Sequence, residues 1–437
     1  MLKMVLFEYL QGRLSPAQWH RDAREHDAMR WLGRGIEPSR SAWYRFRDRM
    51  ADVIEQLHRD LIQRAIDLDL LDAQVGVQDG TTIAACASRH RVVNQQTLRK
   101  RQILLEQAIE SDRLGNPLPQ DTVKWMPTTP SGREELAERM QQAATVLTRR
   151  LEENARKTKA KRKDPKHIFV SLTDSEAAMG RDKLKVFRPL YTIQFMVEPK
   201  SLLVLGYLCR AEATDAGTLT ALIDQVQQTV GGTLQRVLAD SAYATLVDVI
   251  DCDDRGIDLI APVQANSFTA SKQKASGRPK NNRAEFDWNE DQRTYRCPAG
   301  HELDYKGKQQ KQRYGGRQVI EHRYHCRAEH CQGCPLASGC VKNADRGRWI
   351  KRLEGQELLD AQREKMDSEA IKASYRERSQ VIERAFGDAR RHREFNRFHG
   401  RHPWRAATET GLLVLAQNLL TLDRLQRRNA NPDENET

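Results

Sequence analysis

Three carboxylates in distant parts of the chain are of the kind that holds divalent metal ions. Asp79 and Asp240 lie in or directly after segments that read as strands, and Glu383 lies on a predicted helix. Hard cations such as Mg²⁺ take oxygen ligands, and a pair of them can activate a nucleophile and stabilise the leaving oxygen of a phosphodiester. We therefore predict that Asp79, Asp240 and Glu383 converge in one metal site.

Glu383 lies in a basic stretch, residues 375–405, which the rest of the chain must position. Around it Val381, Ile382, Ala385 and Phe386 recur at helical spacing and predict one apolar stripe. A carboxylate surrounded by cationic side chains indicates a metal ligand, and the arginines around it indicate contacts with phosphates. The alternative is a salt-bridged basic helix. The arginines around Glu383 are Arg376, Arg378, Arg384, Arg390, Arg391, Arg393 and Arg397.

The two aspartates also have simpler local interpretations. Residues 75–88 alternate as a half-buried strand or hairpin does, but Asp79-Gly80 in their middle is also the strongest short turn signal. Residues 235–239 predict a strand whose end delivers Asp240, which is where α/β proteins build sites. The alternative for Asp240 is the N-cap of a helix that begins near Thr245.

Composition favours a polyanionic partner. The chain has 437 residues, a formal net charge of +12 and a sequence pI of about 9.3. Nucleic acid is a better partner than a membrane, because no apolar run is long enough to span a bilayer and the N-terminus does not read as a signal peptide. The cysteines do not resemble a secreted disulfide framework, so we predict a cytoplasmic protein.

Cysteines crowd into one segment and suggest a second, softer metal site. Thiolates at C-x-x-C spacing, with further thiols nearby, can close tetrahedrally on Zn²⁺. The alternative is a set of unliganded, reduced thiols. The four preferred zinc ligands are Cys326, Cys331, Cys334 and Cys340, and Cys297 or His301 can replace one of them.

The periodicities predict an α/β protein with helical additions. The N-terminal helices include a basic one near Trp43, which is typical either of a helix-turn-helix DNA reader or of a plain helical cap. The predicted parts are 1–70, helical and of DNA-binding type; 71–263, the first part of a catalytic core, with a helical insertion at 89–167; 264–350, a cysteine-rich insertion; 351–426, the C-terminal helices of the core; and 427–437, a polar tail.

Motifs spread over nearly the whole chain resemble those of DDE transposases of bacterial insertion sequences. VQDGTTIAACAS resembles the D-G-T-x-I-x-A-x-A-S segment with the first acid, here Asp79. VLADSAYAT resembles the A-D-x-G-Y segment with the second, Asp240, although Ala242 replaces the usual Gly. ERAFGDAR resembles the V-E-x-x-F-G-x-x-K/R segment with the third, Glu383. LYTIQ and the C-P-A-G-H cysteine cluster also match, and the group indicated is IS4-like/IS1182-like.

The resemblance implies a fold, a reaction and a set of partners. The fold would be a ribonuclease-H-like mixed sheet with helices, in which Asp79, Asp240 and Glu383 ligate two Mg²⁺ (or Mn²⁺) ions. The reaction would be hydrolysis at the element ends, followed by attack of the freed 3′-hydroxyl on target DNA. The residues expected to contact DNA are Tyr375, Arg378, Arg390, Arg391 and Arg393, although the spacing from Arg378 to Glu383 is one residue longer than usual.

The expected partners are the terminal inverted repeats of the element and the target DNA. A homodimer in the DNA complex and a nucleoid-associated location follow from the same resemblance. Two alternatives remain open at this point. One is a metal-dependent nuclease on the same core that cuts DNA without joining strands. The other is a non-catalytic, zinc-containing DNA-binding protein.

Overall fold

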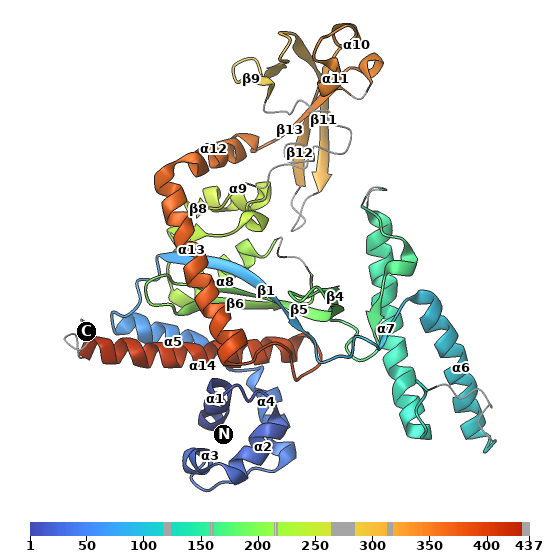
Figure 1. The fold of residues 1–437 in the computed structure, drawn as a ribbon, viewed down its shortest axis with the longest axis vertical. Coiled ribbons are helices and arrows are strands. Elements are labelled where there is room, and N and C mark those ends of the chain that lie inside the picture. The colour runs from blue at the N-terminus through green and yellow to red at the C-terminus, as the bar shows by residue number, and fades with distance from the viewer. Residues whose placement is uncertain are drawn as a thin grey trace. The chain divides into compact units, whose positions relative to one another are not determined.

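A computed structural model describes residues 1–116, 124–157, 159, 161–213, 215, 217–263, 285–312, 318–341 and 343–430. The chain forms two compact units (Figure 1). The first comprises Met1–Asp215, Leu222–Leu234 and Ser379–Thr437, and the second comprises Ala216–Ala221 and Gln235–Arg378. Helices and both parallel and antiparallel strands are present, which confirms the predicted α/β class. The Ser-, Lys- and Asn-rich segment 265–283 and the tail from 431 onward lie outside the described residues.

The N-terminal part of the first unit is helical, as predicted. Ser15 begins one helix with a capping box that pairs it with Gln18, and Ser39 caps another by accepting from the Ala42 amide. Trp19 and Trp43 pack edge to face with ring centroids 6.1 Å apart. The helices are α1 (Leu2–Leu10), α2 (Pro16–Glu25), α3 (Asp27–Leu32), α4 (Arg40–Met50) and α5 (Ile54–Asp67).

The buried carboxyl of Glu8 makes this helical part sensitive to pH. Burial, and then the neighbouring Asp22, raise the pKa of Glu8 to about 8, although Arg13 lies 3.7 Å away. In the unfolded chain the Glu8 carboxyl loses its proton near pH 4.5. Between pH 4.5 and pH 8 the folded chain therefore keeps a proton that the unfolded chain has released. Stability is therefore lost as the pH rises from about 5 to 8. We expect Glu8→Gln to remove this loss, so that its stabilising effect grows with pH to a few kcal/mol.

Thermal unfolding midpoints at pH 5.5 and pH 8 measure this difference. Glu25→Gln is the matched control, because Glu25 lies in the same region with its side chain 67% exposed. Its effect should be small and equal at both pH values. An effect of Glu8→Gln that is constant with pH would show that the Glu8 carboxyl does not hold its proton in the folded chain.

An antiparallel sheet forms the centre of the first unit. β1 (Val75–Ala84) pairs along its length with β5 (Phe187–Val197), which also pairs with β4 (Ala178–Arg181) and β6 (Val204–Arg210). The long helix α14 (Pro403–Ala430) is fixed to this sheet by Asn418. Its side chain accepts from the Val204 amide at 2.9 Å and donates to the Val204 carbonyl at 2.8 Å.

Within residues 89–167, where a helical insertion was predicted, the first unit has a helical hairpin, visible in Figure 1. Its helices are α6 (Gln95–Arg113) and α7 (Pro130–Arg156). Arg133 is almost fully buried and donates two hydrogen bonds of 2.6 Å to Asp112, which join the helices. The short strands β2 (Val92–Val93) and β3 (Val170–Ser171) pair at its base, beside the turn η1 (Pro165–His167).

The second unit begins with a parallel strand pair. β7 (Arg236–Leu238) and β8 (Asp258–Ile260) lie in parallel, with α9 (Leu246–Asp254) between them in sequence. α12 (Gln356–Asp367) is anchored here because the Gln362 amide donates to the carbonyls of Leu259 and Ala261, both at 3.0 Å. Two helices, α8 (Leu219–Val230) and α13 (Glu369–Gly387), each run from one unit into the other.

The cysteine-rich segment forms its own five-stranded antiparallel sheet, in the order β13-β12-β11-β10-β9. Its longest strand, β11, was not predicted from the sequence, and neither was β13. A small apolar core with Phe286, Tyr295 and Tyr324 supports the sheet. The elements are β9 (Asp287–Asn289), β10 (Thr294–Arg296), β11 (Glu302–Gln312), β12 (Gln318–Cys326), β13 (Arg348–Leu353), α10 (Ala328–Cys331), α11 (Ala337–Cys340) and η5 (Ala344–Arg346).

Candidate functional site

Asp79 lies in the middle of β1, half-buried, on one face of the sheet. One of its carboxylate oxygens accepts a hydrogen bond of 2.8 Å from the Gly80 amide. Its cross-strand partner is Phe195, and residues directly opposite in an antiparallel pair share a face. The Asp79 carboxylate and the Phe195 ring therefore lie on the same side of the sheet.

The structure corrects the alternative of a turn at Asp79-Gly80. β1 continues through both residues without a break, and Gly80 pairs with Gln194. A Cβ added at Gly80 would meet Gln194 Nε2 and Asp215 Oδ1 inside van der Waals contact. These two side chains are joined by a hydrogen bond of 2.5 Å. Gly80 is therefore required by close packing on a strand rather than by a turn.

We expect Gly80→Ala to destabilise the first unit by about 1–3 kcal/mol, because the new methyl group overpacks a hydrogen-bonded pair whose Gln194 is fully buried. Urea unfolding midpoints measure this change. Gly232→Ala is the matched control, since nothing lies within 4 Å of a Cβ built there. In a Gln194→Ala background the cost of Gly80→Ala should shrink. An equal cost in both backgrounds would exclude the clash with Gln194 as its cause.

The helix that carries Glu383 packs on the face of the sheet that carries Asp79. Phe386, one helical turn after Glu383, stacks on Phe195 with ring centroids 4.8 Å apart and an interplanar angle of 17°. Val381, Ile382 and Phe386 are buried, which confirms the predicted apolar stripe. Glu383 itself is exposed. The first unit thus places the first and third acids on the same side of one sheet.

The chain beyond α13 follows β1 toward its C-terminal end. A π-helical turn, η6 (Asp388–His392), comes first, and Arg390 within it donates a hydrogen bond of 2.5 Å to the Thr82 carbonyl. Arg397 then forms a parallel bridge with Ala84. These backbone contacts fix the register between β1 and the segment that carries Glu383.

Asp240 lies in the second unit, two residues after the end of β7, which is one residue shorter at each end than the predicted strand. It is not the cap of the helix that follows, because Thr245 caps α9 and forms a capping box with Asp248. Asp240 instead caps the short turn η2 (Ser241–Tyr243), where its Oδ1 accepts from the Ala242 amide at 2.7 Å. The capping alternative was thus right about the type of contact and wrong about the helix.

The basic residues predicted to contact DNA have different surroundings. Arg378 lies 5.5 Å from the centroid of the Tyr375 ring, in the second unit. Burial lowers the pKa of Arg390, which is half-buried. Arg391 is exposed, whereas Arg393 donates to the Leu10 carbonyl and, at 3.1 Å, to Asp388. Arg393 therefore already has a structural role that the sequence did not indicate.

The five cysteines of the cysteine-rich segment line one small cavity of about 20 Å³. Cys297, Cys326 and Cys331 are buried, while Cys334 and Cys340 are half-buried. Burial, and then the neighbouring thiols of Cys331 and Cys297, raise the pKa of Cys326 to about 12. His301 contributes its backbone amide, which donates to the Cys297 sulfur at 3.3 Å.

Across the residues that the structure describes, no group of three or more His, Cys, Asp and Glu side chains is placed to hold a metal ion. The donor chemistry nevertheless suits the predicted metals. Carboxylates are hard ligands for Mg²⁺, and thiolates suit Zn²⁺.

The sequence interpretation missed two polar residues beside Asp79. Gln194 is fully buried, and Asp215 accepts its hydrogen bond next to Gly80. The LYTIQ motif contains Gln194, so a signal was present for that residue. Asp215 follows β6 in a short loop, and nothing local distinguishes it from a surface aspartate.

Part of the chain matches a known protein family. Residues 296–422 match a family model described as a transposase DDE domain. The matched stretch contains Glu383, the basic residues around it and strands β11, β12 and β13 of the cysteine-rich sheet, but neither aspartate. No curated protein and no solved structure matches the chain. No helix among the described residues is long and apolar enough to cross a membrane. The match supports a DDE transposase, an enzyme that acts on DNA.

Proposed function

We propose that the chain is a transposase that cuts DNA at the ends of an insertion sequence and joins the freed ends to target DNA. One observation carries the proposal: the transposase DDE domain match contains Glu383, and the helix bearing Glu383 packs through Phe386 on the strand opposite Asp79. The IS4-like/IS1182-like group and the ribonuclease-H-like core are part of the same proposal.

The proposed catalytic residues are Asp79, Asp240 and Glu383, which would hold two Mg²⁺ or Mn²⁺ ions. Bound ions of this kind supply an activated nucleophile and stabilise the leaving oxygen of the phosphodiester. The three carboxylates provide the hard oxygen ligands that such ions require. DNA-bound homodimers and a location at the nucleoid would follow from this reaction.

The proposed roles of the basic residues differ with their contacts. Arg391 is exposed and suited to a backbone phosphate, and Tyr375 and Arg378 would act as a pair. Arg390 holds Thr82 of β1, so its contribution would include placing Glu383. Arg393 would act mainly by tying the end of α1 to the turn after α13.

Zinc in the cysteine-rich sheet is a second part of the proposal. Its support is the shared cavity lined by Cys297, Cys326, Cys331, Cys334 and Cys340, together with the small apolar core of the sheet. A metal could supply folding energy that so small a core lacks. It would be structural and would not compete for the hard ions of the carboxylates.

The function is tested with labelled duplexes that carry the inverted repeats flanking the gene, incubated with a supercoiled target plasmid and Mg²⁺. A transposase yields labelled plasmid as well as cleaved ends. Cleaved ends without labelled plasmid would favour the nuclease, whose core is the same. Binding without any cleavage would favour the non-catalytic DNA-binding protein.

A further inference from the structure

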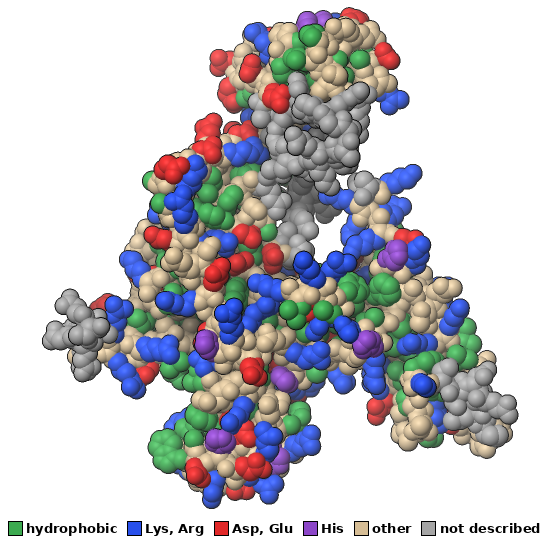
Figure 2. Space-filling view, in the orientation of Figure 1, with side chains coloured by type: hydrophobic (Ala, Val, Ile, Leu, Met, Phe, Trp, Pro, Cys, Tyr) green, Lys and Arg blue, Asp and Glu red, His purple; other side chains and the backbone are tan. Residues whose placement is uncertain are grey.

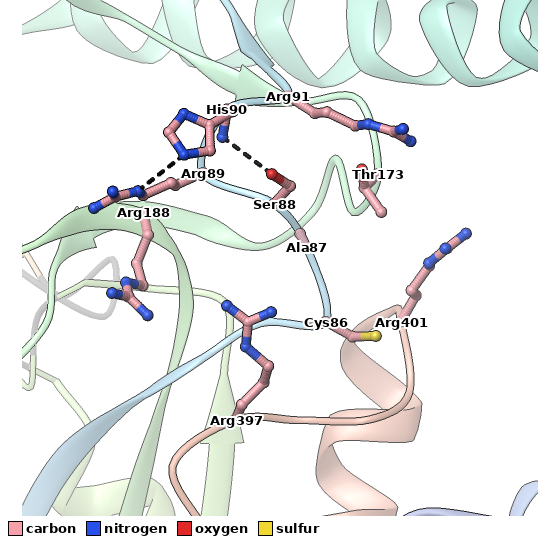
Figure 3. Close-up of a pocket in the computed structure, with 10 residues that line it drawn as sticks. All are labelled: Cys86, Ala87, Ser88, Arg89, His90, Arg91, Thr173, Arg188, Arg397 and Arg401. Carbon is pink, nitrogen blue, oxygen red and sulfur yellow. Dashed lines mark hydrogen bonds between the residues drawn. The ribbon is translucent and has the colours of Figure 1, made fainter. Parts of the chain in front are cut away.

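An arginine-lined cavity of about 460 Å³ lies in the first unit, apart from the acids (Figure 3). This volume falls within the range of roughly 300–1,000 Å³ that is typical of ligand sites. None of its lining residues is acidic, and the hydroxyls of Ser88 and Thr173 add polar groups. We call this cavity the arginine basin. Its arginines are Arg89, Arg91, Arg188, Arg397 and Arg401.

Separate segments of the chain build the arginine basin. Residues 86–91 continue directly from β1, and Arg188 comes from β5 beside it. The segment before α14 supplies Arg397 and Arg401 and is held in place by backbone hydrogen bonds. The Phe398 amide donates to the Ala84 carbonyl at 2.9 Å, and the Ala84 amide donates to the carbonyl of the residue before Arg397 at 3.2 Å. Backbone hydrogen bonds between the end of β1 and the segment before α14 therefore fix the two sides of the basin relative to each other.

The positive charge of the arginine basin is only partly compensated. Arg188 has a carboxylate partner, Asp182, at 3.0 Å. Within the described part of the chain, Arg91, Arg397 and Arg401 have no carboxylate within the 4.0 Å of an ion pair. In Figure 3, Arg188 and Arg397 extend toward one another, and Arg91 and Arg401 lie on the side of the cavity where Thr173 lies. Figure 2 shows blue Lys and Arg side chains gathered at the β4 end of the first unit's sheet. Converging like charges favour an anionic ligand.

We propose that the arginine basin binds the sugar–phosphate backbone of DNA. Guanidinium groups present paired donors that match phosphate oxygens, and several of them in one cavity suit a chain of phosphates better than a single anion. Backbone contacts of this kind position DNA without reading its sequence.

The distance from Asp79 to the arginine basin determines how far from the cut phosphate the basin would contact DNA. This inference rests on the proposed function. Asp79 lies five residues before Ala84, where β1 ends. At about 3.3 Å per residue, the basin lies roughly 17 Å or more from the first acid. A base pair rises about 3.4 Å, so the basin holds the backbone some five or more base pairs from the phosphate that is cut.

The test measures DNA binding in EDTA, where no cleavage occurs. The binding result can therefore be interpreted even if the chain does not catalyse the proposed reaction. Fluorescence anisotropy of a labelled 30-base-pair duplex (~100 Å) is measured over a salt series for the wild type and for Arg397→Gln/Arg401→Gln. The matched control is Arg113→Gln/Arg149→Gln, which removes the same charge from side chains 68% and 62% exposed on α6 and α7.

We expect the basin variant to bind about ten- to a hundredfold more weakly near 0.1 M salt, because two phosphate contacts are lost. The slope of log K against log salt should fall by roughly 1.8, at about 0.9 per contact. Arg397→Lys/Arg401→Lys should keep most of that slope, and the control should bind as the wild type does. Circular dichroism and melting temperature confirm that each variant is folded.

Three outcomes would overturn the proposal. The first is wild-type affinity and salt slope in the folded Gln variant. The second is an equal loss in the Lys and Gln variants, which would mean that charge is not what matters. The third is that inorganic phosphate alone occupies the basin, seen as phosphate-induced thermal stabilisation that the Gln variant lacks, while DNA binding is the same in both proteins.

Discussion

Asp79→Asn, Asp240→Asn and Glu383→Gln are each expected to abolish Mg²⁺-dependent cleavage while DNA affinity stays within about twofold of wild type. Each change keeps the size of the side chain and removes the charge that would hold a metal. Loss of a residue that only supports a metal ligand typically costs 10–100-fold, so loss of a ligand should exceed about 100-fold. Cleavage of end-labelled duplexes and anisotropy in EDTA measure the two quantities.

Matched controls separate a metal ligand from a general loss of negative charge. Glu377→Gln changes an exposed glutamate on the same helix as Glu383, and Asp72→Asn changes an aspartate close before β1 whose side chain is 49% exposed. Both should cleave at the wild-type rate. Cleavage that survives any one of the three acid substitutions at near-normal rate would remove that residue from the site.

The second large effect is expected from Cys331→Ser/Cys334→Ser. These side chains line the cavity shared by all the cysteines of the segment, and a serine hydroxyl is a poor ligand for Zn²⁺. Purified wild-type protein should contain about one zinc ion per chain, because one tetrahedral site uses four of the five cysteines. The double variant should contain none, and protease should then cut between residues 290 and 345. Elemental analysis and limited proteolysis with mass spectrometry measure both effects.

Cys252→Ser is the control for the cysteine pair. Cys252 is buried in α9, outside the shared cavity, so its loss should leave the zinc content unchanged. A wild-type protein free of zinc, with a cysteine-rich sheet that resists protease equally in both forms, would show that the thiols are simply packed as a core.

The sequence predicted the elements whose patterns are local. β5 and α14 are strongly apolar, and both are central in the fold. Ser15 and Thr245 carry side-chain caps that mark the starts of α2 and α9. These signals depend on neighbours within a few residues, which the sequence displays directly.

The missed elements depend on partners far away in the chain. β11 reads ELDYKGKQQKQ, with almost no apolar alternation, and it is a strand because β10 and β12 pair with it on both sides. Gly80 looked like a turn residue in the sequence. The side chains that require a glycine there, Gln194 and Asp215, lie more than a hundred residues away in the chain. Long-range pairing overrides local propensity in both cases.

The candidate site divides in the same way. Asp79, Asp240 and Glu383 were predicted as site residues because motifs surround them, whereas the arginine basin has no motif. Its members Arg91, Arg188 and Arg401 come from segments that only the folded chain brings together. Arg393 was assigned to DNA by its charge, but its guanidinium faces the Leu10 carbonyl. Charge alone does not show what a basic side chain contacts.

The contact between Arg393 and Leu10 has a consequence for shortened copies of the gene. The first helix ends at Leu10, and Arg393 joins its last carbonyl to Asp388, the residue directly after α13. A copy whose translation starts downstream of this helix would retain every acid and every motif, yet it would lack the anchor for the C-terminal end of α13. The motifs of such a copy would all be present, but the contact that holds the end of the helix bearing Glu383 would be missing. Under the proposed function, erosion of the gene from its 5′ end would therefore abolish cleavage before any of the three acids was lost.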